Sequence, residues 1–348
     1  MTPTAAEPGF GQHFTPHLVT AEWSREDGWN RPVLRPYGPL TLDPATVGLH
    51  YGQVVFEGLK AYRQQDGRIA IFRPHEHAHR FAASARRLAM PELPADVFVD
   101  AVTQLVAVDR ASVPSAEGQS LYLRPLMFAS EANLALRPAD HYRFLALAFV
   151  SGSFFDPARP AVSVYAGRRY ARAVPDGTGA AKCAGNYGAT LLAQAEAAEH
   201  GCQQVLWLDS RERRWVEELG GMNLFFVRRR GDSAQVVTPP LTGTLLPGVT
   251  RASLLTLAAD LGHDVAEEAI TIDALRRDCE SGEITEVFAC GTAAVVSPVG
   301  VLHTEDTSWT VGTGGMGPVA EQLRRALSDV HFGRAPDPHG WLLHLPVP

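Results

Sequence analysis

Two lysines stand out among the residues that could do chemistry, because the chain has no others. Lysine and arginine together number 31, and only Lys60 and Lys182 are lysines. A lysine amine can lose its proton near neutral pH and attack a carbonyl, whereas arginine stays charged. A general bias toward arginine explains why lysine is rare. It does not explain why Lys182 lies in residues 177–188, a run with four glycines and three alanines that lets a ligand approach the backbone. We therefore expect reactive chemistry at Lys182 and a structural role for Lys60.

Two turns in the second half of the chain would suit a phosphate group. Residues 247–250 precede an apolar helical pattern, so their backbone N–H groups would meet an anion at the positive end of a helix. Residues 291–294 follow a predicted strand and add further backbone donors and a hydroxyl. Each turn alone is weak evidence, since glycine turns after strands are common.

Adjacent carboxylates, Glu217 and Glu218, precede two glycines at the edge of an apolar strand. A buried carboxylate that faces a pyridine nitrogen keeps that nitrogen protonated, and the ring then accepts electrons from a carbanion. An ordinary exposed turn explains the same residues equally well.

A different chemistry is suggested by His75-Glu76-His77-Ala78-His79, which fits the zinc-hydrolase pattern H-E-x-x-H. Such a site also needs a third ligand. The pentad directly follows Pro74, at an expected helix N-terminus, so we favour an exposed helical turn that carries Arg80 inward. We expect no metal, and a zinc hydrolase using His75, Glu76 and His79 remains the outside alternative.

The elements around these motifs are expected to form two domains. Residues 1–150 are predicted to be a small α+β domain whose first twenty residues, rich in Thr, Pro and Gly, form a loosely held arm. A linker rich in Gly, Ser and Pro follows at 151–160, and 161–348 is predicted to be a larger mixed α/β domain. The expected strands are 54–56, 69–72, 120–127, 142–150, 161–165, 204–208, 224–228, 286–290 and 294–297, and the expected helices are 74–88, 94–111, 187–200, 251–261 and 318–328.

The bulk composition excludes several classes of protein. A chain of 348 residues with 45% hydrophobic and 20% charged residues is typical of a globular protein with about two domains. The net charge of -7 argues against a nucleic-acid surface. The longest apolar run, 144–150, is far too short to span a bilayer, so no membrane contact is expected. Four widely spaced cysteines and the absence of a signal pattern favour the cytoplasm.

Taken together, these motifs resemble the fold-type IV pyridoxal-phosphate enzymes, and most closely the branched-chain amino-acid aminotransferases of bacterial type. The resemblance implies an α+β fold with a small α+β N-terminal domain, a larger mixed α/β C-terminal domain and the cofactor in the cleft between them. It also implies a homodimer. It covers nearly the whole chain, and the strings that carry it are 49–62, 72–74 with Arg80, 121–125, 182–190, 218–226, 246–251 and 340–341.

The resemblance implies reversible transfer of the amino group of L-leucine, L-isoleucine or L-valine to 2-oxoglutarate, giving L-glutamate, by a ping-pong mechanism with pyridoxal 5'-phosphate. In it, Lys182 would bind the cofactor covalently and move the proton, Glu218 would contact the pyridine nitrogen, and Tyr187 the phenolic oxygen. Other implied cofactor contacts are Arg80, Gly248, Val249, Thr250 and Thr292. Implied substrate contacts are Tyr51, Phe56, Tyr122, Arg124, Gly221, Thr292 and Ala293, of which Arg124 would meet the distal carboxylate of glutamate.

Other readings remain within and outside this family. A D-amino-acid transaminase or an aminodeoxychorismate lyase is the nearest alternative, but these relatives are generally shorter and lack the string at 121–125. A cofactor-binding protein that no longer catalyses is an alternative of another class. Two positions depart from vertebrate or mammalian relatives: Gly221 replaces a threonine, and 294–297 replaces a redox C-x-x-C, so we expect no thiol switch there.

Overall fold

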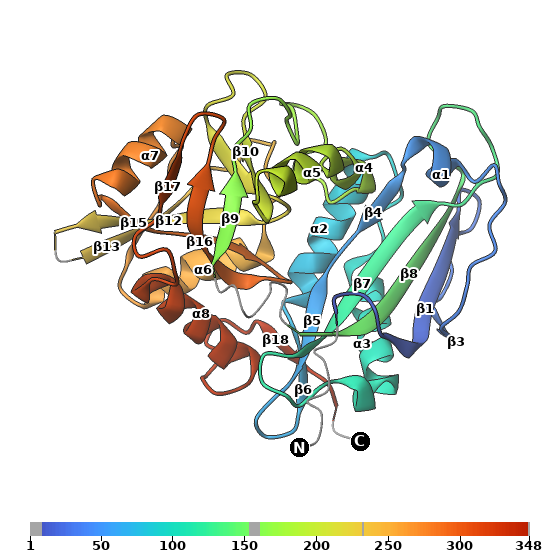
Figure 1. Ribbon diagram of the computed structural model, residues 1–348. Helices are drawn as coiled ribbons and strands as arrows, with labels where there is room; N and C mark the ends of the chain where they lie inside the picture. The colour runs from blue at the N-terminus through green and yellow to red at the C-terminus, as the bar shows by residue number, and fades with distance from the viewer. Residues whose placement is uncertain (1–8, 153–160, 232, 347–348) are drawn as a thin grey trace, which may run out of the picture. The chain divides into compact units, whose positions relative to one another are not determined.

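A computed structural model describes residues 9–152, 161–231 and 233–346 (Figure 1). The chain divides into two compact units. Unit 1 consists of Met1–Phe154, Ala181–Gly185 and Asp329–Pro348, and unit 2 of Phe155–Ala180 and Asn186–Ser328.

Unit 1 is built on a nine-stranded sheet in which all pairs are antiparallel. The strand order is β18-β6-β5-β7-β8-β1-β2, with β3 added to β1 and β4 added to β7. The long pair β7–β8 carries buried side chains on both faces, which keeps it at the centre of the unit. The strands are β1 (Phe14–Ser24), β2 (Gly28–Trp29), β3 (Val33–Pro36), β4 (Val54–Phe56), β5 (Leu59–Arg63), β6 (Ile69–Phe72), β7 (Ser120–Ala129), β8 (His141–Ser151) and β18 (Leu342–His344).

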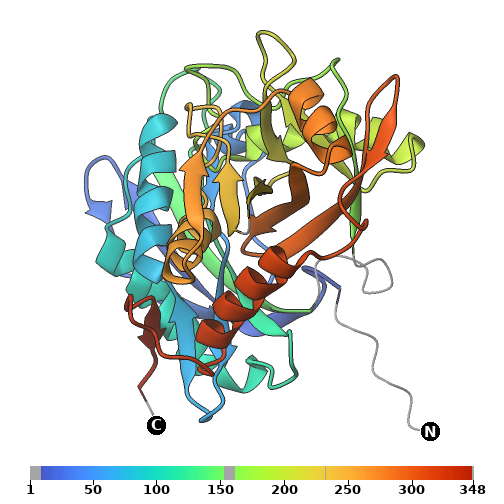
Figure 2. The same cartoon turned by 90° about the vertical axis from the view of Figure 1, so that its left-hand side faces the viewer.

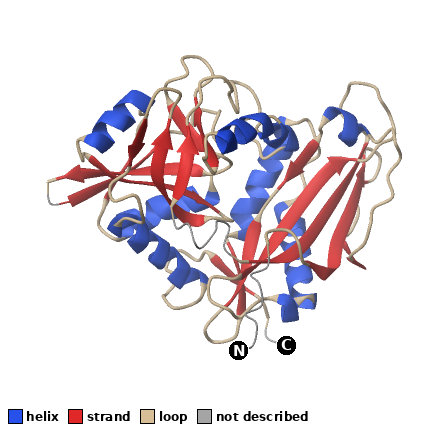
Figure 3. Cartoon of the chain, in the orientation of Figure 1, coloured by secondary structure: helices blue, strands red, loops and turns tan. Residues whose placement is uncertain are grey.

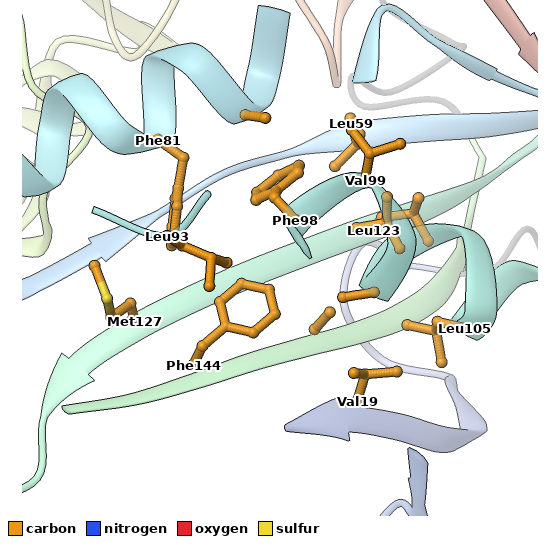
Figure 4. Close-up of a cluster of buried hydrophobic side chains, with 14 of the residues drawn as sticks. Val19, Leu59, Phe81, Leu93, Phe98, Val99, Leu105, Leu123, Met127 and Phe144 are labelled. Carbon is orange, nitrogen blue, oxygen red and sulfur yellow. The ribbon is translucent and has the colours of Figure 1, made fainter. Parts of the chain in front are cut away.

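Two helices of unit 1, α2 (Pro74–Arg87) and α3 (Ala95–Val108), pack with the sheet around an aromatic core (Figure 4). The Phe81 ring lies 5.4 Å from that of Phe98 and 5.8 Å from that of Phe144. Proline begins α2 because the first helical turn needs no backbone donor there. Its buried positions recur at helical spacing, so one face of α2 turns inward. Unit 1 also has the short helix α1 (Val47–Tyr51) and the 3-10 turn η1 (Arg110–Ser112).

The predicted N-terminal arm is the largest error in the expected elements. Residues 14–24 form β1, a full strand that pairs with β8 and with β3. Its apolar side chains Leu18, Val19 and Ala21 are buried. Proline and threonine in this segment suggested a loop, but long-range pairing with β8 decides its structure. Predicted strands 54–56 and 69–72 agree with β4 and β6 to the residue.

Unit 2 is built on a second nine-stranded sheet, in which parallel and antiparallel pairs are mixed (Figure 3). The order is β11-β10-β9-β16-β15-β12-β13-β14, with β17 added to β16, and β9 runs parallel to both β10 and β16. The strands are β9 (Val162–Tyr165), β10 (Gln204–Leu208), β11 (Val216–Leu219), β12 (Asn223–Arg230), β13 (Ser233–Thr238), β14 (Asp264–Glu267), β15 (Ile284–Gly291), β16 (Val295–His303) and β17 (Ser308–Thr310).

The helices that follow in the chain end where the sequence pattern indicates. Gly262 adopts a φ of 82° just after Leu261, as a residue beyond a helix C-cap must. The start of the last long helix depends on a distant residue instead: both Glu286 carboxylate oxygens accept hydrogen bonds from the backbone of Val319 and Ala320. The helices are α4 (Ala184–Gly188), α5 (Leu191–Glu199), α6 (Val249–Asp260), α7 (Ile272–Glu280) and α8 (Pro318–His331).

The units differ from the predicted domains in two places, because the chain returns to unit 1 twice after leaving it. Residues 181–185 return through backbone contacts with β4, and the C-terminal residues return through pairing of β18 with β6, dark red in Figure 2. The predicted linker, 151–160, begins at the last residue of β8, and 153–160 lies outside the described residues.

Candidate active site

The backbone of Lys182 is held within unit 1 by three contacts. Its N–H donates to Ser84 Oγ on α2 at 2.9 Å, and its carbonyl accepts from Phe56 N–H at 3.0 Å. The next residue, Cys183, forms a β-bridge with Val55 on β4. The glycine-rich segment that precedes the lysine belongs to unit 2. The predicted reactive amine is therefore fixed to unit 1, on elements distant in sequence.

Aromatic rings surround the cationic groups of this site. The Lys182 Nζ atom lies 5.0 Å from the centre of the Phe56 ring, and the guanidinium carbon of Arg124 lies 5.1 Å from the same ring. Arg124 is also 5.5 Å from the ring of Tyr122. Two cations near one ring are attracted to its π-face but repel each other, which favours a bound anion near them. The Arg124 Nε atom is buried and has no hydrogen-bond partner among the described residues.

Gly58 explains how Tyr122 reaches this position. A Cβ atom at Gly58 would lie 1.8 Å from Tyr122 Oη, so any side chain there would displace the phenol. Tyr122 also stacks on Phe149, with ring centres 4.9 Å apart. Four of the predicted residues of unit 1, Lys182, Phe56, Tyr122 and Arg124, thus form one group.

Arg80, a predicted phosphate contact, is bound to a buried carboxylate. Its Nε and Nη2 atoms donate to the two oxygens of Glu57 at 2.7 and 2.8 Å, and His77 Nδ1 lies 2.7 Å from Glu57 Oε2. Burial by itself would raise the pKa of Glu57, but the charges and hydrogen bonds of Arg80 and His77 hold that pKa well below its usual value. Burial lowers the pKa of His77, although Glu57 opposes the shift.

The H-E-x-x-H pentad does not form a ligand set. His75 and His79 are exposed on α2, whereas the middle histidine, His77, is buried against Glu57. Within the described ranges, no three His, Cys, Asp or Glu side chains are grouped so as to hold a metal ion. The prediction of an exposed helical turn carrying Arg80 inward therefore holds, except at His77.

In unit 2, Glu218 lies on β11 with its carboxylate oriented by three groups. Its Oε1 accepts hydrogen bonds from Leu246 N–H at 2.7 Å and from Asn223 Nδ2 at 3.2 Å, and its Oε2 lies 2.9 Å from Arg172 Nε. The residue is only 2% exposed. A buried carboxylate with a guanidinium partner stays ionised, as a partner of a protonated ring nitrogen must.

Arg172 was missed by the sequence reasoning. Its Nη2 atom donates to the carbonyls of Gly179 and Thr244, besides the ion pair with Glu218. A Cβ at Gly179 would lie 2.4 Å from Thr244 O, so the glycine allows these two backbone segments to meet. The glycine-rich run before Lys182 thus serves a close backbone approach. Only the presence of an arginine just upstream of that run could have drawn attention to Arg172.

The neighbouring carboxylate, Glu217, has a different environment. Successive residues of a strand point to opposite faces, and Glu217 accepts a hydrogen bond from Thr244 Oγ1. Burial raises the pKa of Glu217, which the threonine and Arg172 only partly oppose. The two adjacent carboxylates are therefore not equivalent, and Glu218 is the ionised one.

The two candidate phosphate turns lie at the same edge of the unit 2 sheet. Gly248 is the N-cap of α6, and a Cβ there would lie 2.0 Å from Asn223 Oδ1. Asn223 pairs with Cys290, beside the turn that joins β15 to β16, and α6 packs against β15. Asn223 also bonds Glu218, so the carboxylate belongs to the same edge. Predicted residues at this edge are Gly248, Val249 and Thr250 at the start of α6, and Thr292 and Ala293 in the turn.

Two further predicted residues, Tyr187 and Gly221, are neighbours in unit 2. A Cβ at Gly221 would lie 3.4 Å from Tyr187 Cε1, an ordinary contact distance. Tyr51, by contrast, is 48% exposed and donates its hydroxyl proton to Leu134 O. Its place in a substrate pocket stays a prediction.

A family model described as amino-transferase class IV matches residues 54–301, which include every site residue above except Tyr51. The chain belongs to this class IV aminotransferase family. Its relatives include a probable branched-chain-amino-acid aminotransferase from Streptomyces coelicolor, 53% identical over 97% of this chain and 92% of the relative. The predicted family, the branched-chain-amino-acid aminotransferases, is confirmed.

Solved structures of this aminotransferase family share the fold. The branched-chain amino acid aminotransferase of Escherichia coli matches with a TM-score of 0.77 at 27% identity, over 94% of this chain and all (100%) of the other. A second branched-chain amino acid aminotransferase, from the source abbreviated T.th. and complexed with N-(5'-phosphopyridoxyl)-L-glutamate, matches with a TM-score of 0.76 at 29% identity, over 96% and 100% of the two chains. The predicted α+β, fold-type IV class is confirmed.

Proposed function

We propose that this aminotransferase moves the amino group of L-leucine, L-isoleucine or L-valine to 2-oxoglutarate, using pyridoxal 5'-phosphate. The observation that carries the proposal is the group around Lys182. The only glycine-flanked lysine of the chain lies beside Phe56, with Arg124 on the same ring, in a chain of this family.

The residues present fit the cofactor. The helix N-terminus at Gly248 and the turn at Thr292 offer backbone donors for a phosphate, and Glu218 offers an ionised carboxylate for a ring nitrogen. The cofactor itself supplies an aldehyde for the amino group and a ring that accepts electrons. These assignments, with Arg80 and Tyr187, are supported by the resemblance and by the shared edge of the sheet.

Lys182 Nζ is the group that removes the proton from the substrate Cα atom and returns it one carbon away. Its backbone is held by Ser84 and Phe56, so only the side chain needs to move. Glu218 stays ionised through Arg172 and thereby favours the proton on the ring nitrogen. The chain's own contribution is to position these two groups.

One pocket must accept an apolar side chain and the carboxylate of glutamate. Phe56 and Tyr122 supply aromatic walls, while Arg124, whose Nε is unpaired among the described residues, supplies the donor for a distal carboxylate. We assign the amino-acid carboxylate to the turn at Thr292 and Ala293, and Gly221 leaves room beside it.

We also propose a homodimer located in the cytoplasm. Large apolar side chains that a single chain leaves exposed, Leu49, Tyr51, Leu134 and Leu136, support a second copy. All four cysteines are free and buried, as expected under reducing conditions. Of the described part of the chain, no helix is both long and apolar enough to cross a membrane.

The proposal is tested by adding L-leucine to the cofactor-loaded protein and following its absorbance, and then adding 2-oxoglutarate. The spectrum should change with L-leucine and recover with 2-oxoglutarate. In Lys182→Ala, turnover should fall by at least about a thousandfold while the protein stays folded, because the nucleophile and base are both lost. A response to D-alanine but not to L-leucine would make the protein a D-amino-acid transaminase. Unchanged turnover in Lys182→Ala would end the assignment of the base.

A further inference from the structure

Three ionisable side chains of unit 1 form a buried cluster that the proposed chemistry uses only in part. Glu57 lies between β4 and β5 and is 0% exposed, and His77 on α2 is 2% exposed. The Arg80 side chain, one turn further along α2, is 9% exposed. Only Arg80 has a role in the proposed cofactor site.

The geometry of this cluster fixes the orientation of the guanidinium. Arg80 uses Nε and Nη2 to reach the two oxygens of Glu57, a paired arrangement that sets the plane of the group. Glu57 is fixed in turn by His77 Nδ1 at 2.7 Å and by the backbone N–H of Gly58 at 3.1 Å. A guanidinium has five N–H donors, and this pair takes two of them.

Stability alone does not explain such a cluster. A buried ion pair loses its hydration, and well-packed apolar residues often replace one without loss of stability. A long arginine side chain without a partner has many rotamers, and binding an anion must then restrict them. A carboxylate that orients the guanidinium in advance removes that cost.

The same stretch of α2 also holds the backbone of the predicted catalytic lysine. Ser84 Oγ donates to Arg80 O at 2.9 Å and accepts from Lys182 N–H at 2.9 Å. Arg80 and Lys182 are therefore supported by one helix. A shift of either group is limited by α2, and Glu57 is the contact that orients the Arg80 side chain itself.

We propose that Glu57 is a positioning residue, which holds Arg80 in the orientation that binds the cofactor phosphate and is itself held by His77. The inference rests on the proposed function, in which Arg80 contacts that phosphate. It predicts that loss of Glu57 weakens recognition of the phosphate group and leaves recognition of the pyridine ring intact.

The test compares two ligands that differ only in the phosphate. Cofactor-free protein is titrated with pyridoxal 5'-phosphate and with pyridoxal, and binding is followed by absorbance and tryptophan fluorescence. In Glu57→Gln, the Kd for pyridoxal 5'-phosphate should rise about tenfold or more, as expected for a weakened charged contact, while the Kd for pyridoxal changes less than about twofold. Arg80→Met should show the same selective loss, and Glu57→Gln should add little to it in the double variant.

Glu76→Gln is the matched control, because Glu76 is a half-exposed carboxylate on the same helix, 3.7 Å from Arg73. It should leave both Kd values unchanged. Glu57→Asp keeps the charge but shortens the side chain. It serves as the second variant if Glu57→Gln does not fold, and it should show the same selectivity.

Equal loss for both ligands, or no loss for either, would overturn the positioning role. Failure of the proposed function gives a different result. In that case the wild-type protein would show no preference for pyridoxal 5'-phosphate over pyridoxal, or borohydride would fail to link the cofactor to Lys182.

Discussion

At the scale of single residues, the site depends on partners that hold the functional groups. Lys182 and Glu218 were expected from local patterns, because a lone lysine among glycines and a carboxylate at a strand edge are visible in the sequence. Arg172 and Glu57 were not, because their significance lies in distant contacts with Glu218 and Arg80. The roles of the site residues stay proposals, but the structure shows which of them are neighbours.

Replacement of Arg172 should destabilise unit 2 strongly. In Arg172→Met the buried Glu218 loses its ionic partner, so we expect a loss of about 3–5 kcal/mol in the free energy of unfolding. The double variant Arg172→Met with Glu218→Gln should recover part of that loss, since no charge is then left unpaired. Urea denaturation of the cofactor-free proteins measures both. A loss below about 1 kcal/mol would show that the ion pair is not required for stability.

At the scale of elements, patterns of apolar residues predicted most strands and helices, and the errors lie where tertiary contacts override composition. The helix at 74–88 and the strands at 54–56, 69–72 and 204–208 carry periodic apolar residues. In β1, prolines and threonines concealed a strand that is stabilised by its neighbour β8.

The two interpretations of the N-terminal segment differ in their effect on stability. Val19 is fully buried in β1, so Val19→Ala should reduce the free energy of unfolding by about 2 kcal/mol. Thr20→Ala, at the next and partly exposed position, is the control and should change it by less than about 0.5 kcal/mol. Thermal and urea unfolding measure the difference. Equal, small effects would favour a loosely held arm.

At the scale of the whole molecule, ionisable groups buried in unit 1 should make it sensitive to acid. Burial lowers the pKa of His77, and it lowers that of His331 to about 3, with Lys60 adding to the effect. Glu57 has a pKa held below its usual value despite its burial. For all three groups the unfolded chain binds protons at a higher pH than the folded chain, so stability falls with pH.

The expected window follows from these directions. The histidine contribution should begin to disappear as pH falls through about 6.5, and the Glu57 contribution as pH falls through about 4.5, each with a slope up to about 1.4 kcal/mol per pH unit. His331 stacks on Tyr62 at 4.3 Å, so His331→Phe keeps an aromatic ring while removing the proton site. Urea midpoints measured from about pH 7 to about pH 4 should depend less on pH in this variant. An unchanged profile would exclude His331 as a source of the acid sensitivity.

The sequence by itself determined the reactive lysine, the ionisable candidate at Glu218, the glycine turns and the family, because each is carried by residues close together in the chain. Only the tertiary structure decided that Lys182 belongs to unit 1, that β1 is a strand, and that Arg172 and Glu57 orient the charged groups. The reason is physical. Contacts such as Phe56 with Lys182 join residues far apart in sequence, and no local pattern records a hydrogen bond or an ion pair that forms only after the chain has folded.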